Sequence, residues 1–215
     1  IYRCPVIPRR NGTAFWLSLN YLSYVFSGLL SSIFLLKNKI DLIYVYQGSP
    51  ITVAFPAIFI KKIKKIPICI SVVDLWPESV SSASNLKSDF IPKLLIPIVK
   101  YIYSNCDLIL VSSRGFINSI LNKGISDHKI KFLPQWAESI FKPIQQGKYQ
   151  LESVPTNSFK IMFAGNVGEA QDFASIIETA KLLKNNEAIH WLIIGSGRKV
   201  EGVKMEIKKS FPYAW

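Results

Sequence analysis

Short apolar runs alternate with longer runs of helical spacing along almost the whole chain. The apolar runs predict six strands, at Leu42–Tyr46, Ile66–Val73, Leu108–Ser112, Ile130–Leu133, Lys160–Ala164 and Ile189–Ile194. The longer runs predict six helices, at Thr13–Leu36, Ile51–Ile63, Ile91–Ser104, Gly115–Asn122, Ala170–Leu183 and Arg198–Lys209. Short strands that are apolar on both faces and alternate with helices are typical of parallel sheets covered on two sides. The pattern therefore predicts an α/β fold.

The alternation lapses once, in a polar, proline-bearing stretch between Phe141 and Ser158, and restarts beyond it. Such a stretch is typical of a connector between domains. We therefore predict a first domain over residues 1–143, a linker over 144–158 and the start of a second domain over 159–215. Both domains are expected to be doubly wound.

The charge balance favours an anionic partner. The chain carries a formal net charge of +12, and lysines cluster at Lys61, Lys62, Lys64 and Lys65. No nucleic-acid-binding module accompanies these cations, so nucleic acid is not expected as a partner. The basic residues border strongly apolar segments, which favours attraction to an anionic membrane surface. The three cysteines have no metal-ligand spacing, so no zinc site is expected, and unpaired thiols fit a reducing cytoplasm.

Two apolar segments are candidates for membrane contact. Thr13–Leu36 contains no charged residue and is long enough to span a bilayer. Its serines, Asn20 and the positive charge at both of its ends argue against spanning. We expect a helix that packs on the sheet or lies partly in the membrane interface. Residues 90–101, with Lys93 and Lys100 on one side, form either a second interfacial helix or a core helix with solvated lysines.

The stretch Phe163-Ala-Gly-Asn-Val-Gly-Glu-Ala-Gln-Asp-Phe173 joins a predicted strand to a predicted helix through a glycine-bearing loop. The first N–H groups of a helix have no partner within the helix and can bind an anion. Gly165 and Gly168 would let the main chain pass close to a ligand. This loop therefore indicates phosphate binding.

Two further polar groups follow predicted strands, where ligand-binding groups gather in open α/β sheets. Asp74 and Glu78 flank a Trp-Pro turn after one strand, so their carboxylates could lie close together and form the candidate catalytic pair. Glu78 could instead stabilise the N-terminus of the next helix. Gln135, Trp136 and Glu138 follow another strand and are candidates for the mouth of a cleft or for an ordinary proline turn.

Gly195-Ser-Gly197 also follows a predicted strand and precedes a helix. A dinucleotide fingerprint would need a third glycine where Val200 stands and an acidic ribose ligand further on, so NAD binding is not expected. No GxxxxGK[ST] motif is present, which argues against P-loop phosphoryl transfer. One alternative remains for this segment, a tight turn beside a bound nucleotide.

Asp74-Leu-Trp-Pro-Glu-Ser79, Leu133-Pro-Gln-Trp-Ala-Glu138 and the loop 163–173 resemble, in this order, motifs of glycosyltransferase family 4. The chain is similar to the bacterial surface-polysaccharide branch, which includes proteins assigned as fucosamine transferases of O-antigen synthesis. The resemblance implies a GT-B fold of two Rossmann-like domains. It also implies retaining transfer of a sugar from a nucleotide-sugar donor, with no metal or other cofactor. The implied acceptor is a polyprenyl-diphosphate-linked sugar at the cytoplasmic face of the bacterial membrane.

Carried over by position, the resemblance implies that Gly165, Asn166, Gly168, Gln171, Gly195 and Gly197 bind the donor and that Asp74 faces the acceptor. Asn166 and Gln171 stand where many family members have Arg and Lys, so main-chain amides and neutral side chains would hold the diphosphate. The family's N-terminal glycine-rich loop and its late acidic pair are absent, and two full domains need roughly 150–200 residues each. We therefore expect both domains to be incomplete and the fragment to be inactive alone. Two alternatives stay open: an inactive membrane-associated remnant of a disrupted gene, and a nucleotide-sugar epimerase of GT-B architecture.

Overall fold

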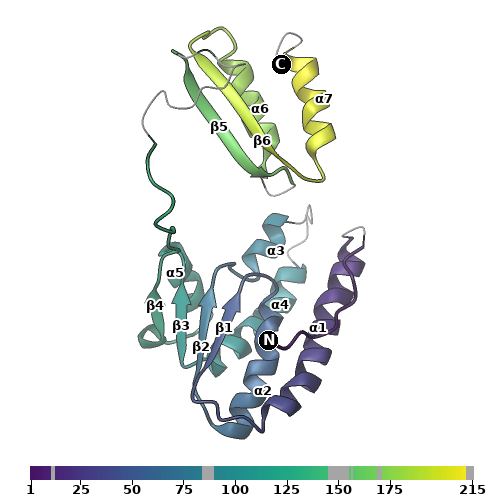
Figure 1. Cartoon of the computed structure of the whole chain (residues 1–215), viewed down its shortest axis with the longest axis vertical. Coiled ribbons are helices and arrows are strands. Elements are labelled where there is room, and N and C mark those ends of the chain that lie inside the picture. Colours follow the sequence, from purple (N-terminus) through teal and green to yellow (C-terminus); the bar gives the residue numbers. More distant parts are fainter. Residues whose placement is uncertain (11–12, 84–89, 145–154, 156, 169–170, 212–215) are drawn as a thin grey trace. The chain divides into compact units, whose positions relative to one another are not determined.

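The computed structural model describes residues 1–10, 13–83, 90–144, 155, 157–168 and 171–211 of the chain. These residues form two compact units, Ile1–Trp136 and Ala137–Trp215 (Figure 1). The boundary between the units precedes the stretch 144–158 that the sequence suggests as the linker. Residues 145–154 and 156 of that linker lie outside the described residues.

The first unit contains a four-stranded parallel sheet of β1 (Ile43–Gln47), β2 (Ile68–Val72), β3 (Leu108–Val111) and β4 (Ile130–Phe132). The strands lie side by side in chain order, β1-β2-β3-β4. Its helices are α1 (Ala14–Leu35), α2 (Phe55–Lys64), α3 (Glu78–Ala83), α4 (Phe90–Asn105) and α5 (Gly115–Asn122), with short 3₁₀ turns at Ile51–Ala54 and Asp127–Lys129.

Local sequence explains where the helix α2 begins and ends. Pro56 stands in its first turn, where a missing N–H costs nothing, and Lys65 closes the helix in the left-handed conformation at φ 56°. Helix α1 packs closely on α2 because Gly28 has no side chain: a Cβ there would lie 2.8 Å from Cγ of Pro56. The charge-free segment is therefore a helix packed against its neighbour α2, whereas the sequence predicts a helix that packs on the sheet or lies partly in the membrane interface.

The core of the first unit lies between one face of the sheet and its helices. Strand β2 is buried along its whole length. The fully buried side chains come from β2, β3, α4 and α5, and include Ile68, Ile70, Val72, Val99, Ile102, Tyr103, Ile109, Val111 and Ile120. This packing fixes the sheet and hence the loops that leave its carboxyl edge.

The second unit contains two parallel strands, β5 (Phe159–Asn166) and β6 (Ile189–Ser196), with α6 (Phe173–Leu182) and α7 (Val200–Ser210). Its buried core is small and consists of Val167, Phe173, Ile177 and Val203. Phe163 of β5 meets Phe173 of α6 edge to face, with ring centroids 4.9 Å apart. The unit is one strand–helix–strand–helix repeat.

The structure confirms the α/β class, the parallel sheets and the predicted positions of strands and helices to within a few residues. Four details differ. The segment predicted as one helix over 51–63 begins as a 3₁₀ turn, and α3 has no counterpart in the sequence prediction. The first residue predicted for the helix 170–183, Ala170, lies outside the described residues, and α6 begins at Phe173. The prediction that the strands are covered on both faces holds for β2, which is buried along its length, but not for β1, whose Tyr44 and Tyr46 are exposed.

Candidate functional site

The carboxyl ends of β5 and β6 bring the predicted donor-binding residues together. The two strands pair to their last residues, with Gly165 opposite Gly195 and Asn166 opposite Ser196. The backbones approach so closely that a Cβ on Gly195 would lie 1.8 Å from the carbonyl oxygen of Gly165. Only glycine fits at position 195, and its first role is to let the two strand ends meet.

The two turns beyond these strands also touch. Gly197 has φ 154°, and a Cβ there would lie 2.2 Å from the carbonyl oxygen of Val167 and 2.7 Å from Oδ1 of Asn166. A Cβ on Gly168 would lie 2.6 Å from Nδ2 of Asn166. The side chain of Asn166 therefore sits between Gly168 and Gly197, so the residues expected to hold the donor lie at one edge of the second unit.

The sequence expectation about main-chain amides is wrong in part, because several of these amides are used by the fold. The N–H of Val167 donates to the carbonyl oxygen of Ser196 at 2.8 Å. The N–H of Gly168 donates to Oε1 of Gln171 at 3.1 Å. Gly165 and Asn166 belong to β5 rather than to the loop. The predicted phosphate loop thus begins two residues later than the sequence suggests.

The N-terminus of α6 is also partly occupied. Asp172 caps this helix in the left-handed conformation at φ 43°, and its carboxylate accepts hydrogen bonds from the N–H and the hydroxyl of Ser175. A capping carboxylate uses a helical N–H and places negative charge where an anion would bind. The helix end is therefore a weaker anion site than the sequence suggests.

Sequence reasoning missed two cations beside this edge. Arg198 and Lys199 directly follow Gly197, and both are exposed. The N–H of Lys199 donates to the carbonyl oxygen of Val167 at 3.0 Å, which ties this residue to the loop after β5. The run Gly-Arg-Lys at the N-terminus of a helix was the signal that could have identified them, because it places two positive charges where the dipole already favours an anion.

At the carboxyl edge of the first unit, Asp74 follows β2 and is half-buried. Its carboxylate accepts a hydrogen bond from the indole N–H of Trp76 at 3.3 Å. Trp76 is 7% exposed and meets Tyr21 of α1 edge to face. Asp74 therefore helps to position a buried tryptophan while it remains reachable from the loop side.

Glu78 lies in the first turn of α3, as the alternative reading of this residue expects. Its carboxylate accepts hydrogen bonds from the Ser119 hydroxyl of α5 and from the ammonium of Lys123, the residue that follows α5, the latter at 2.6 Å. Burial alone would raise the pKa of Glu78, but the hydrogen bonds from Lys123 and Ser119 outweigh it and hold the pKa below its usual range. Asp74 and Glu78 thus have different partners, and Glu78 anchors α3 to α5.

Tyr103 of α4 is fully buried close to both carboxylates. Burial raises the pKa of its hydroxyl far above the usual range, and the negative charges of Glu78 and Asp74 contribute to the same effect. Its hydroxyl has no hydrogen-bond partner among the described residues. It remains a neutral phenol at any physiological pH.

The third predicted group follows β4. Gln135, Trp136 and Glu138 are exposed, with Trp136 at 71%. The boundary between the units falls between Trp136 and Ala137, so Gln135 and Trp136 belong to the first unit and Glu138 to the second. Within the second unit, the carbonyl oxygen of Glu138 accepts a hydrogen bond from the N–H of Phe141 at 3.0 Å.

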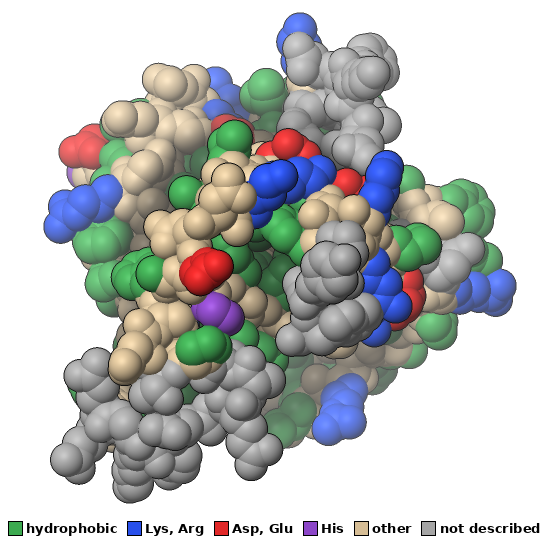
Figure 2. Space-filling model, turned by 90° about the horizontal axis from the view of Figure 1, so that it is seen from above, with side chains coloured by type: hydrophobic (Ala, Val, Ile, Leu, Met, Phe, Trp, Pro, Cys, Tyr) green, Lys and Arg blue, Asp and Glu red, His purple; other side chains and the backbone are tan. Residues whose placement is uncertain are grey.

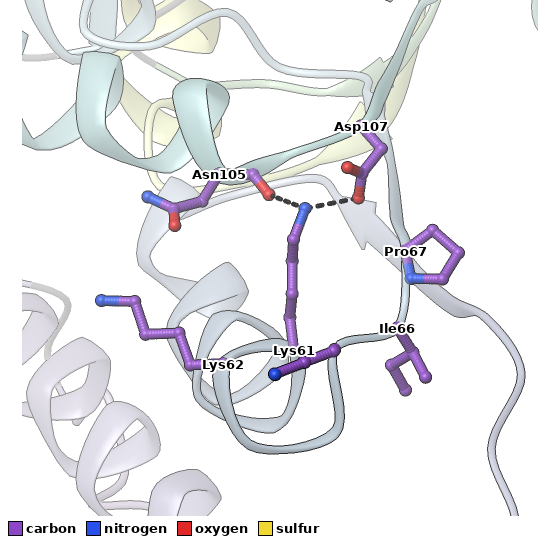
Figure 3. A pocket seen from close by; sticks show the side chains of 7 residues that line it. Lys61, Lys62, Ile66, Pro67, Asn105 and Asp107 are labelled. Carbon is purple, nitrogen blue, oxygen red and sulfur yellow. Dashed lines mark hydrogen bonds and ion pairs between the residues drawn. The ribbon is translucent and has the colours of Figure 1, made fainter.

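A lysine-lined pocket lies at the opposite, amino edge of the first unit's sheet (Figure 3). It has a volume of about 440 Å³ and is lined by Lys61, Lys62, Lys65, Ile66, Pro67, Asn105 and Asp107. Lys61 reaches both the carbonyl oxygen of Asn105 and the carboxylate of Asp107, as Figure 3 shows. The same carboxylate oxygen also accepts the N–H of Ile68. Three lysines and one carboxylate line the pocket, so its lining carries a net positive charge.

Apolar side chains are exposed on the first unit as well. Among the described residues, one helix, α1, is long and apolar enough to cross a membrane by length and composition. Only Gly28 and Ser32 of this helix are buried. The exposed apolar residues Phe15, Leu22, Phe26, Leu30 and Ile33 recur at spacings of seven, four, four and three, which places them along one side. On the face of the molecule that Figure 2 shows, apolar side chains are likewise exposed beside lysines and arginines.

Comparison with known proteins adds one curated relative. No family model matches the chain. WcaI of Escherichia coli K12, whose name assigns it to colanic acid biosynthesis as a glycosyl transferase, is 30% identical over 99 residues. The match covers 43% of this chain and 24% of WcaI. The matched residues therefore correspond to about a quarter of that relative.

Solved structures share the fold at low sequence identity. Anabaena HepE, crystallised with UDP and glucose, superposes with a TM-score of 0.64 at 12% identity, over 86% of this chain and 48% of HepE. TarM of S. aureus, crystallised with UDP among other ligands, gives 0.57 at 13% identity, over 86% of this chain and 34% of TarM. The lipopolysaccharide outer core galactosyltransferase WaaB gives 0.51 at 16% identity, over 90% of this chain and 47% of WaaB. The fold is that of GT-B glycosyltransferases, and the chain spans at most about half of these proteins.

Proposed function

We propose that this chain is part of a glycosyltransferase that moves a sugar from a nucleotide-sugar donor to a glycan acceptor. The proposed product is a bacterial surface polysaccharide such as O-antigen. The observation that carries the proposal is the convergence of Asn166, Gly168 and Gly197 at the carboxyl ends of β5 and β6, the edge at which α/β sheets bind ligands. The likeness to WcaI and to the UDP-bound HepE and TarM supports the same reading.

We propose that the second unit binds the donor diphosphate at this edge. Gly195 and Gly197 let the ends of β5 and β6 and the turns that follow them approach each other closely, which gathers the expected donor-binding residues at one edge. The side-chain amides of Asn166 and Gln171 provide neutral hydrogen-bond donors. Arg198 and Lys199 add the positive charge that a diphosphate requires. Binding of this kind needs no metal, and we propose none.

We propose that the first unit serves the acceptor. Asp74 is the better candidate for a role beside the reacting sugar, because within the described part of the chain its carboxylate accepts a single hydrogen bond, from Trp76. Glu78 is held by Lys123 and Ser119, so its contribution is to position the loop that carries Asp74. Transfer with retention at the anomeric carbon belongs to the same proposal.

The acceptor we propose is a polyprenyl-diphosphate-linked sugar, with the protein peripheral at the cytoplasmic face of the bacterial membrane. The exposed apolar side of α1, which includes Phe15, Leu22 and Phe26, supports contact with lipid. Lys37, Lys39 and the lysines at 61–65 stand near the carboxyl ends of α1 and α2 and would be attracted to anionic headgroups. Salt should therefore release the protein from anionic vesicles.

Binding of UDP-glucose to the purified chain, followed by calorimetry, tests the donor site. Gly168→Val should weaken binding at least about tenfold, because its side chain would displace Asn166 and Gln171, which lie 2.6 and 3.0 Å from the Cβ position. Gly202→Val is the matched control, because no atom lies within 4 Å of its Cβ position. Equal affinity of both variants and the parent chain would refute this donor site. A transfer assay tests the activity itself. It uses the product of the complete reading frame, with UDP-glucose and other nucleotide sugars as donors and a polyprenyl-diphosphate-linked sugar as acceptor.

A further inference from the structure

The lysine-lined pocket of the first unit has no role in the proposed sugar transfer. It lies beside the residues that precede β2 and β3, whereas the candidate acceptor residues follow the strands at the opposite edge of the sheet. Its volume of about 440 Å³ is within the range of small-molecule sites. Figure 3 shows Lys61 reaching Asn105 and Asp107. Ile66 and Pro67 also line the pocket, so it has a charged side and an apolar side.

Some lysines at this edge serve the fold. The carboxyl end of a helix leaves carbonyl groups without partners and carries partial negative charge, so cations stabilise it. Lys61 donates to the carbonyl oxygen of Asn105, the last residue of α4, and pairs with the carboxylate of Asp107. Lys64 donates to the carbonyl oxygen of Asn38, just beyond α1. These two ammonium groups offset the negative helix ends, which would otherwise repel an anion.

The other two lysines of this group, Lys62 and Lys65, have no such task. The ammonium of Lys62 donates to the hydroxyl of Tyr101 at 2.7 Å, and a phenol carries no charge near neutral pH that could compensate it. Lys65 is exposed, and its side chain makes no hydrogen bond or ion pair within the ranges that the structure describes. Its backbone is held at the end of α2 by an N–H bond to the carbonyl oxygen of Lys61 at 2.7 Å. Both positive charges therefore remain for a ligand.

The charge of the pocket lining matches a dianion. Three lysines and one carboxylate give the lining a formal charge of +2. A phosphate monoester carries about −1.5 to −2 at pH 7, whereas a phosphate diester or a carboxylate carries a single negative charge and would leave positive charge in excess. Lysine is a common phosphate ligand, which acts as a compact point charge. The apolar side of the pocket suits a small organic group attached to the phosphate.

We propose that this pocket binds a phosphate monoester, with Lys62 and Lys65 contacting the phosphate and with Ile66 and Pro67 contacting the organic part. Two sources present this chemistry, a soluble phosphorylated small molecule and the headgroup of phosphatidic acid. The proposal depends neither on the donor site nor on sugar transfer. It also differs from general attraction to an anionic membrane, because it requires both the monoester and this pocket.

Titration of the isotope-labelled chain with sn-glycerol 3-phosphate, followed by NMR chemical shifts, tests the soluble source. The amides that line the pocket should shift. The lining variant, Lys62→Gln with Lys65→Gln, should bind at least about tenfold more weakly, because both phosphate contacts lose their charge. The control variant, Lys184→Gln with Lys209→Gln, removes two exposed lysines of the second unit and should bind as the parent chain does. All four side chains are exposed, so both variants should melt within about 2 °C of the parent chain.

The ligand's own charge provides a second readout. Dimethyl phosphate, a diester with one negative charge, should bind at least about fivefold more weakly than glycerol 3-phosphate. Lowering the pH from about 7.5 to about 5 should weaken the binding of glycerol 3-phosphate by about fivefold or more, because the second pKa of a phosphate monoester is about 6 while lysines stay charged. Affinity that is the same for monoester and diester would overturn the proposal.

Vesicles distinguish the two sources. If the source is lipid, phosphatidylcholine vesicles that carry phosphatidic acid should bind the chain more tightly than vesicles that carry phosphatidylglycerol at the same surface charge, and the lining variant should lose this preference. If the source is soluble, glycerol 3-phosphate should bind at the pocket while the chain shows no preference between the vesicles. Either result supports the proposal. It is overturned by the absence of both, or by an equal loss of binding in the lining and control variants.

Discussion

Replacing Gly195 by alanine is the sharpest test of how closely β5 and β6 approach each other, because the structure gives both the sign and the size of the expected change in stability. The new Cβ would lie 1.8 Å from the carbonyl oxygen of Gly165 and 3.0 Å from its carbonyl carbon. Both atoms are backbone atoms of the paired strand, so no side chain can rotate away. Overpacking of this kind costs typically 1–3 kcal/mol and more where the backbone must move, so we expect a loss of about 3 kcal/mol or more.

The matched control is Gly202→Ala in α7. No atom lies within 4 Å of its Cβ position, and glycine within a helix is less stable than alanine by roughly 0.5–1 kcal/mol. The same glycine-to-alanine change should therefore destabilise the second unit at position 195 and stabilise it at position 202. For a unit of this size, 1 kcal/mol corresponds to about 4–8 °C in melting temperature.

Thermal unfolding followed by circular dichroism and calorimetry measures both variants. We expect the transition of the second unit to fall by roughly 12 °C or more in Gly195→Ala and to rise by about 2–8 °C in Gly202→Ala. A Gly195→Ala protein that melts with the parent would show that the ends of β5 and β6 lie further apart than described. The close approach of the two turns, and the donor site built on it, would then be wrong.

Four further predictions follow from individual contacts. Lys123→Met should lower the free energy of unfolding by roughly 0.5–1 kcal/mol at pH 7, because the carboxylate of Glu78 is half exposed and its ion pair is screened. Since the pKa of Glu78 is lowered in the folded state, the difference from the parent chain should begin to shrink as the pH falls below 4.5 and vanish below the pKa of folded Glu78; a difference that does not shrink on acidification would contradict this origin. Tyr103→Phe should leave stability unchanged or raise it slightly, because the buried hydroxyl has no partner among the described residues, and a loss above about 1 kcal/mol in urea unfolding would reveal a partner. In the native protein a thiol reagent should modify Cys4 first and Cys106 last, because Cys106 is buried and burial raises its pKa to about 12. After unfolding in guanidinium the modification rates of the cysteines should become equal. Arg198→Gln with Lys199→Gln should weaken UDP binding at least about tenfold at low salt and flatten its salt dependence, whereas Lys204→Gln, one turn into α7, should change neither.

The periodicity of apolar residues was enough to predict most of the fold. Strand β2 is buried on both faces, and its sequence is a nearly continuous apolar run. Helix α5 begins and ends at the predicted residues. Helix α3 was missed because its six residues, three serines and a glutamate among them, are too few to show a helical period. The 3₁₀ turn at Ile51–Ala54 was read as helix because three- and four-residue spacings cannot be separated over four residues.

The site was harder to predict, because hydrogen bonds between segments distant in sequence decide which groups remain for a ligand. The partner of Glu78 is Lys123, which lies 45 residues away, and no local pattern indicates this pair. The amide of Val167 is used by Ser196 across the sheet. Sequence alone finds the glycines, but it cannot distinguish a glycine required by the neighbouring strand, as at Gly195, from one required by a ligand.

These contacts change where donor affinity must come from. A loop that offers uncovered amides binds a diphosphate largely through the main chain, and neutral residues at positions 166 and 171 would then suffice. In this structure the amides of Val167 and Gly168 have partners, and Asp172 places a negative charge at the N-terminus of α6. A diphosphate would therefore meet fewer open amides and one like charge. Cationic side chains must offset both effects, and Arg198 and Lys199 stand beside the same edge, at the start of α7.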